Sequence, residues 1–161
     1  MSELAHLDEG DLFWPNGEQV DVKTIDAWSE HARVNIRPSA DDGVVRGPDW
    51  VIGELDAISR LAADMAVVVK MSGALKRSRS RVLKRARADA RKKHAGVKGP
   101  EQTALVDLDV TVEQEEYDDA AIADEYARHI SDLVSDRKST VQTMGKHVEI
   151  LYRDALSGRH T

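Results

Sequence analysis

The chain contains no cysteine, and this absence removes several kinds of chemistry at once. Disulfide bonds, thiolate nucleophiles and cysteine-ligated zinc are all excluded. Aromatic residues are also scarce, at 4% of the 161 residues with a single Phe, so few large rings are available to fill a wide core. A charged fraction of 32% beside so few rings favours a long-helix or thin-bundle protein over an α/β enzyme.

Long apolar runs are missing too. No run approaches the roughly 20 residues that a membrane-spanning helix needs. The acidic start of the chain lacks the charged-then-apolar pattern of a signal peptide. We therefore expect a protein that is neither membrane-bound nor secreted, and that is cytoplasmic or packaged from the cytoplasm.

The motifs of common enzyme classes are absent from the chain. It has no GxxxxGK[ST], GxGxxG, HExxH or GxSxG pattern, the patterns of phosphate binding, zinc hydrolysis and acyl transfer. Its six histidines show no ligand spacing on a shared helix face, and adjacent carboxylates such as Glu115 and Glu116 fit a solvated surface. We therefore expect no enzymatic activity, no catalytic residue, no metal or cofactor, and no small-molecule substrate.

What the chain does contain is a segregation of charge. The formal net charge of −6 divides into −7 over residues 1–50, +9 over residues 51–100 and −8 over residues 101–161. The basic charge is concentrated in residues 76–93, which hold ten Lys or Arg and a single acid, Asp89. This pattern indicates electrostatic pairing within the chain, between chains or with a polyanion.

Two apolar repeats of alternating three- and four-residue spacing predict an all-α fold. The first belongs to a helix from a cap at Asp49 to about Ala95, with a bend expected at Ser72-Gly73. Its repeat positions are Ile58, Leu61, Met65, Val68, Ser72, Leu75, Arg79, Val82 and Ala86. The second covers residues 104–156, and its repeat positions are Leu105, Leu108, Val112, Glu115, Asp119, Ile122, Tyr126, Ile130, Leu133, Arg137, Val141, Met144, Val148, Leu151 and Ala155.

The segment between the two repeats is rich in helix breakers. Residues 94–102 read HAGVKGPEQ, and Gly suits a helix end as Pro suits a helix start. We therefore expect a turn here and a long antiparallel, coiled-coil-like helical hairpin over residues 49–156. We favour a continuous second helix, but period-two alternation over residues 106–112 also fits a short extended piece. Thr111 and Gln114 would then restart the helix as a capping box.

Residues 1–48 are expected to form an irregular or β-like N-terminal arm. Short apolar runs flank Asn16-Gly17, so a β-hairpin and an extended arm both fit the pattern. Four large aromatic side chains lie in or directly after the arm: Phe13, Trp14, Trp28 and Trp50. Because such rings are frequent anchors, they either hold the arm on the protein's own helices or dock it on a neighbouring subunit.

The arm should contain one short helix. Thr24 is a candidate cap for a helix over residues 25–33. The chain from Val34 to Pro38 is expected to be extended, because the residue before Pro avoids the helical region. At the other end of the chain, residues 157–161 are expected to form a tail.

The basic segment 76–93 has two kinds of partner available. Antiparallel pairing about the turn brings it opposite residues 103–120, which hold seven acids and no base, so one interpretation is a charge zipper between the helices. The alternative is an outward face that contacts phosphates or an acidic protein partner, a second copy included. Its candidate residues are Arg77, Arg81, Lys84, Arg85, Arg91 and Lys92. No aromatic is interleaved with them, so nucleic-acid binding would be non-specific.

One apolar side of the first helix also needs a cover. Its members are Val51, Leu55, Ile58, Ala62 and Met65. We expect this side to pair with the far end of the second helix or with another subunit, since an apolar helix face is stable only when it is buried.

Two heptad helices joined at residues 94–102, an Ala-rich basic first helix and a late stretch from Tyr126 through Leu133 and Arg137 to Val141 characterise the chain from Leu61 onward. In these features it resembles small helical-hairpin proteins encoded by tailed phages of actinobacteria. The resemblance implies no site residues and has no counterpart for the first 50 residues.

From the resemblance we expect a non-enzymatic structural or assembly protein, such as a virion or head–tail component. It would oligomerise or dock on protein partners through its helices and aromatic arm, in the host cytoplasm or in the virion. The charge pattern supports an alternative: a DNA-associated accessory protein of replication or recombination that binds phosphates non-specifically through residues 76–93.

Overall fold

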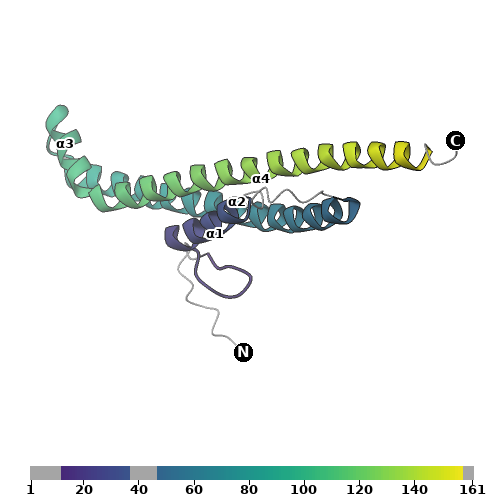
Figure 1. Cartoon of the computed structure of the whole chain (residues 1–161). Helices are drawn as coiled ribbons and strands as arrows, with labels where there is room; N and C mark the ends of the chain where they lie inside the picture. The colour runs from purple at the N-terminus through teal and green to yellow at the C-terminus, as the bar shows by residue number, and fades with distance from the viewer. Residues whose placement is uncertain (1–11, 37–46, 158–161) are drawn as a thin grey trace.

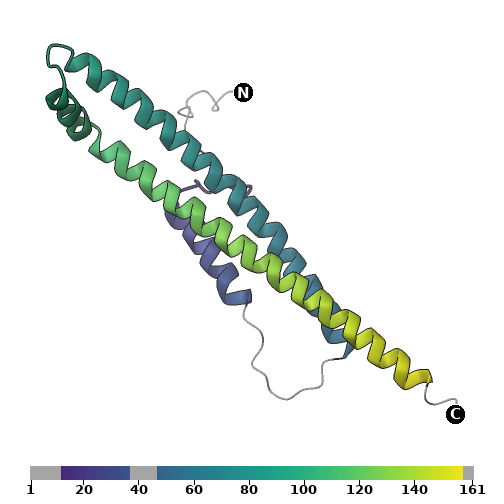
Figure 2. The same cartoon turned by 90° about the horizontal axis from the view of Figure 1, so that it is seen from above.

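The fold is all-α, as the sequence predicts, in a computed structural model that describes residues 12–36 and 47–157. Over these residues the helices are α1 (Val22–Ile36), α2 (Pro48–Lys93), α3 (Pro100–Asp109) and α4 (Thr111–Ser157). The two long helices lie side by side and run in opposite directions, and α1 packs against both (Figures 1 and 2). The helix α3 lies at the tip of the rod, where the chain turns back. The predicted arm before Leu12 and the predicted tail after Ser157 lie outside the described residues.

The first long helix has nearly its predicted length, but its cap is different. Gly47 is the N-cap residue and Pro48 occupies the first turn, where the missing N–H of proline has no cost. Asp49 lies inside the first turn, so the predicted cap at Asp49 is wrong. The predicted bend does not interrupt the helix, which is continuous across Ser72-Gly73. Both of these residues are buried.

The second repeat is not one helix, contrary to the prediction. Val110 separates α3 from α4 with φ −113° and ψ 19°, and neither Gly nor Pro marks the break. The Val110 side chain is buried in a small cluster with Val106, so packing holds the chain at this angle. Thr111 Oγ1 donates to the carbonyl oxygen of Asp107 at 3.2 Å, a local bond that competes with regular helix. The segment is helical up to Asp109, so the extended alternative is wrong as well.

The two long helices approach each other through small side chains. Ser72 and Gly73 on α2 and three alanines on α4 are all buried. We call these five residues the small-residue waist: Ser72, Gly73, Ala120, Ala123 and Ala127. Larger buried side chains lie on either side of the waist, among them Met65, Val68, Ile130 and Val134. At the centre of the rod small side chains are therefore part of the helix contact, and Ser72 Oγ of α2 lies 2.9 Å from Asp124 Oδ1 of α4.

The predicted heptad register is wrong along α3 and the first part of α4. The predicted positions Leu108, Val112 and Ile122 are 72%, 65% and 66% exposed. The positions that are buried instead are Val106, Val110, Ala120, Ala123 and Ala127. On α2, Leu83 is buried in place of the predicted Val82, which is 39% exposed. The break at Val110 changes the phase of the repeat, so different positions face α2 before and after it. In the first part of α4 the buried positions are occupied mainly by Ala, which takes less space between helices than Leu or Ile.

The apolar side of α2 is covered within the chain itself. Val51, Ile58 and Met65 are buried, and Leu55 and Ala62 are half-buried. Near the start of α2, Val51 Cγ1 lies 3.0 Å from the place a Cβ on Gly145 would take. The far end of α4 therefore supplies part of the predicted cover.

The helix α1 is longer than predicted at both ends. It starts at Val22 because Asp21 and Thr24 form a reciprocal cap. Asp21 Oδ1 accepts from the Thr24 N–H at 2.7 Å, and the Asp21 N–H donates to Thr24 Oγ1 at 3.1 Å. The cap is therefore Asp21 and not the predicted Thr24. The predicted extended conformation is wrong from Val34 to Ile36, which are still helical.

The loop before α1 is tied to the rod by side chains. A single isolated bridge joins Phe13 to Gln19, and the described residues contain no strand. Trp14 is buried in the main core, and its Nε1 donates to Thr24 Oγ1 at 3.1 Å. On the other side of α1, the Tyr126 hydroxyl of α4 donates to Glu30 at 3.0 Å.

Candidate interaction surfaces

The inward-facing bases of residues 76–93 pair with acids across the rod. Arg79 Nη1 lies 2.9 Å from Glu116 Oε2, and Lys93 Nζ lies 2.8 Å from Asp109 Oδ2. Both pairs are open to water, so each contributes little to stability. Their main effect is to select the antiparallel register in which basic and acidic segments lie opposite each other.

At the tip of the rod, one carboxylate holds the turn. Asp109 Oδ2 accepts from Lys93 and also lies 2.9 Å from His94 Nε2. These hydrogen bonds, from Lys93 first and then His94, hold the pKa of the Asp109 carboxyl below its usual range. Gln102 Nε2 donates to the His94 carbonyl oxygen at 3.1 Å, which links α3 to the end of α2.

The six predicted contact bases lie together on the face of α2 that points away from α4. All six are exposed. We call them the outer basic stripe: Arg77, Arg81, Lys84, Arg85, Arg91 and Lys92. At about 100° per residue their directions fall within a sector of roughly 120°, and they cover about 22 Å of helix. Lys92 pairs with Asp89 of its own helix at 3.4 Å. Arg77, Arg81 and Lys84 form no ion pair within the described part of the chain.

The outward face of α4 carries the opposite charge. From residue 111 to residue 136 this helix has nine acids and one base, Arg128. The acids that are exposed and share the outward face form the outer acidic stripe: Glu115, Asp118, Glu125, Asp132 and Asp136. Ile122 lies within this stripe and is 66% exposed. Sequence reasoning missed the stripe because the heptad placed Glu115 and Ile122 on the inner face.

A buried carboxylate lies at the waist. Asp124 has a side chain only 5% exposed, and it accepts hydrogen bonds from Ser72 Oγ at 2.9 Å, Lys76 Nζ at 3.4 Å and Arg128 Nε at 3.1 Å. Burial raises the pKa of the Asp124 carboxyl, but the hydrogen bonds from Arg128 and Ser72 outweigh it and hold the pKa below its usual range. Such a group fixes which turn of α4 meets Ser72.

A second inter-helix pair lies nearer the start of α2. Arg137, a predicted heptad position, is 11% exposed at its side chain, and its Nη2 donates to Glu54 Oε1 at 2.9 Å. The heptad spacing located Arg137, but nothing in the spacing identified Glu54 as its partner.

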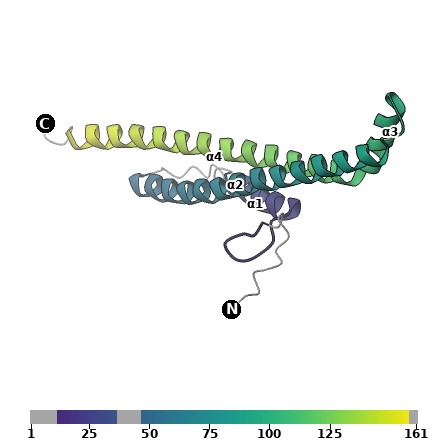
Figure 3. The same ribbon diagram turned by 180° about the vertical axis from the view of Figure 1, so that it is seen from behind.

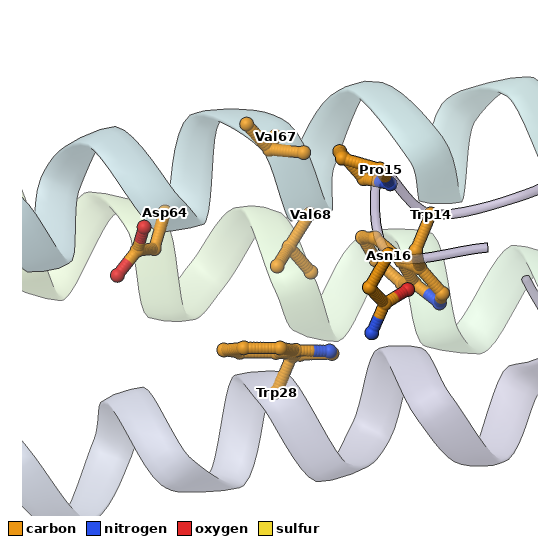
Figure 4. A pocket seen from close by; sticks show the side chains of 7 residues that line it. All are labelled: Trp14, Pro15, Asn16, Trp28, Asp64, Val67 and Val68. Carbon is orange, nitrogen blue, oxygen red and sulfur yellow. The ribbon is translucent and has the colours of Figure 1, made fainter. Parts of the chain in front are cut away.

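The predicted aromatic anchors have different surroundings. Trp14 is buried, Trp50 is half-buried, and Phe13 and Trp28 are about 40% exposed. The Trp14 and Trp28 ring centroids are 6.3 Å apart. Together with Val67, Val68 and Asp64 of α2 they line a groove of about 300 Å³ (Figure 4). Trp28 and Val68 face each other across this groove, so the arm covers α2 only in part.

The end of α4 has a large apolar surface. This helix continues past the first turn of α2 (Figure 3), and every residue from Glu149 to Ser157 is exposed. Four large side chains in this segment are each more than half exposed: Ile150, Leu151, Tyr152 and Leu156. We call them the α4 end patch.

Comparison with protein-family models, with curated proteins and with solved structures finds no match to this chain. Within the described ranges, no three His, Asp or Glu side chains come together as metal ligands. No helix in those ranges combines the length and the apolar character that crossing a membrane requires.

Proposed function

We propose that this protein is a non-enzymatic structural or assembly component, of the kind found in the virion or head–tail region of tailed phages. It oligomerises or docks on protein partners through its helices. The observation that carries the proposal is the α4 end patch, four exposed apolar side chains within about two turns of helix. Exposed large apolar side chains gathered in one short segment mark interaction sites, because covering apolar surface gains about 25 cal/mol per Å².

The shape of the chain supports the same proposal. With 46 residues, α2 alone is about 70 Å long, whereas a compact domain of this chain length has a radius of gyration of about 15 Å. A thin rod buries little of its own surface, so assembly is its main route to further burial. The tryptophans of the arm add partly exposed rings to the available contact surface.

The proposal is tested by the mass of the purified protein in solution. Mass must be measured directly by light scattering, because elongation alone already changes the sedimentation coefficient. We expect a concentration-dependent mass above the 17.8 kDa of one chain. Replacing Leu151 and Leu156 with Ser should lower that mass. The matched control replaces Leu108 and Val112, which are equally exposed at the other end of the rod, and should leave it unchanged. A wild-type monomer at every concentration contradicts the proposal.

A second candidate function is favoured by the outer basic stripe: non-specific binding to the nucleic-acid backbone, as in a replication or recombination accessory protein. Six exposed bases on one face can each neutralise a phosphate, and each phosphate adds about −0.9 to the log–log salt slope on duplex DNA. Fluorescence anisotropy with a labelled duplex should then give a slope of about −3 to −5. Reversing Arg81, Arg85 and Arg91 to Glu should abolish binding. No binding at low salt contradicts this function.

A further inference from the structure

We propose that the outer basic stripe of one copy binds the outer acidic stripe of a second copy, so that the rods associate side by side. This inference rests on the proposed assembly function and names the partner, a second copy of this chain. The two long helices lie side by side. By helix geometry each stripe faces away from the other long helix, so the stripes lie on opposite edges of the rod. Each copy therefore presents both halves of the interface.

Where the two stripes overlap along the rod, around Arg81 of α2 and Glu115 of α4, the positions of the charges agree with this pairing. Within one chain, residues that meet across the rod have numbers that total about 196, as Ser72 with Asp124 and Arg79 with Glu116 do. A neighbour displaced sideways, without a shift along the rod, obeys the same rule. The exposed base Lys70, which precedes the outer basic stripe on the same face of α2, then lies opposite Glu125, and Arg81 of the stripe lies opposite Glu115.

The spacings on the two helices also match. Lys70 and Arg81 are separated by about 16.5 Å along α2, and Glu115 and Glu125 by about 15 Å along α4. Both pairs lie on the faces directed away from the other long helix of their own chain, so they do not compete with the inner pairs. Every helix in such an array has antiparallel neighbours, as within the single rod.

An apolar contact accompanies the charges. Ile122 is 66% exposed in the single chain, although it lies between acids of the outer acidic stripe. The side-by-side arrangement places it opposite the half-buried Ala74 of the neighbouring α2. Covering Ile122 adds apolar burial to an interface whose exposed ion pairs are individually weak.

Side-by-side association of this kind is heterologous, because two different edges of the rod meet at each contact. The basic edge of one copy contacts the acidic edge of the next, and each added copy leaves both edges free. Such heterologous contacts build rings or open arrays and do not stop at a dimer. Because the contacts are charged and exposed, they weaken as the Debye length falls from about 10 Å at 0.1 M salt to about 3 Å at 1 M.

The test uses two charge-reversal variants of the full chain. The first is Lys70→Glu with Arg81→Glu, and the second is Glu115→Lys with Glu125→Lys. All four side chains are exposed and have no ion pair within the described residues, so circular dichroism should show unchanged helix content. At 50 mM salt we expect each variant alone to self-associate at least tenfold more weakly than wild type. An equimolar mixture should recover the association, because the basic edge of the second variant meets the acidic edge of the first.

The control is Lys98→Glu with Lys146→Glu, which changes the net charge by the same amount away from both stripes and should associate like wild type. The inference is overturned if both stripe variants associate like wild type, or if their mixture does not recover association. In either case wild-type oligomers would leave the assembly function standing, whereas a wild-type monomer would contradict that function itself. Loss of duplex DNA binding in the first variant, with unchanged self-association in both, would assign the basic stripe to nucleic acid and overturn the inference.

Discussion

The two halves of the rod are stabilised in different ways. The half beside α1 contains a core cluster of thirteen buried apolar residues, drawn from the arm loop, α1, α2 and α4. The tip half contains a cluster of four: Leu83, Ala90, Val106 and Val110. In the tip half, the contacts between helices are mostly ion pairs and hydrogen bonds, such as Lys93 with Asp109.

This difference shows what α1 contributes. Two long helices alone enclose only a narrow seam, and the small-residue waist narrows it further. Where α1 covers the groove between α2 and α4, large side chains such as Ile25 and Met65 become fully buried. Where α1 is absent, the seam is held by exposed charges that each contribute little. The tip half should therefore open locally at lower free energy than the α1 half.

The largest expected effect comes from removing core volume in the α1 half. Ile130→Ala, at a side chain 1% exposed in the main cluster, should destabilise the fold by roughly 3–5 kcal/mol, since the rigid surroundings leave a cavity. Leu83→Ala in the tip half should cost about 2 kcal/mol, because the thin tip can collapse around the gap. Urea unfolding followed by circular dichroism measures both. Equal losses at the two sites would contradict the comparison.

The next largest effect is a pH dependence of the folding stability, caused by Asp124 at the waist. The pKa of Asp124 is held below its ordinary value of 3.8 in the folded chain. Its ionised form therefore stabilises the fold above that value, and the contribution is lost as the pH falls through the depressed folded pKa. Asp124→Asn should flatten the fall of melting temperature that occurs as the pH drops below about 3.8.

A suitable control for the pH experiment is Asp132→Asn on the exposed outer face of α4. This substitution removes the same charge at a side chain that has no buried hydrogen-bond partners. The change of its melting temperature with pH should therefore follow that of wild type in the acid range. If the two variants respond alike, the buried hydrogen bonds at Asp124 do not set the acid stability.

A smaller effect, of opposite sign, is expected at Gly73. A Cβ there would lie 3.5 Å or more from the nearest side-chain atoms, those of Arg128, Arg77 and Asp124, which is ordinary contact. Gly73→Ala should therefore stabilise the continuous helix by about 0.5–1 kcal/mol through helix propensity. Thermal unfolding measures the gain. A loss of stability would mean that the waist requires glycine for closer packing than the distances indicate.

The smallest expected effect is the coupling between Arg79 and Glu116. Because both side chains are about 40% exposed, a double-mutant cycle with alanine should give a coupling of about 0.2–1 kcal/mol that declines with salt. A coupling above about 2 kcal/mol would show that the tip half is not held by weak charges.

The sequence predicted the helices better than their contacts. The class of fold, the two long helices and the turn after His94 follow from periodicity and from the Gly and Pro residues between the repeats. The break at Val110 was indicated only by the alternative that restarted the helix at Thr111, because it is held by tertiary packing at a residue that is not a helix breaker. Its effect on phase then made the heptad wrong for Leu108 and Ile122.

Among the candidate surfaces, too, those that depend on a single helix were predicted and those that depend on contacts between helices were not. The six outer bases were identified from the sequence because a dense charge run on a long helix must expose one face. The buried cluster around Asp124 was not identified, because a single acid among many gives no signal until the close approach of the helices is known. The α4 end patch was also missed, since Leu151 and Ala155 continue an apolar repeat that looks like core.

The small-residue waist has a geometric consequence for the ends of the rod. It joins α2 near the middle of that helix to α4 near its start. From the waist, α2 extends about 36 Å in one direction and about 30 Å in the other, and α4 extends about 45 Å towards its C-terminal end. A small change in the crossing angle at the waist is therefore converted into a displacement of several Å at the α4 end patch and at the tip. Substitutions at Ala123 or Ala127 can re-orient both binding regions without altering any residue that a partner touches.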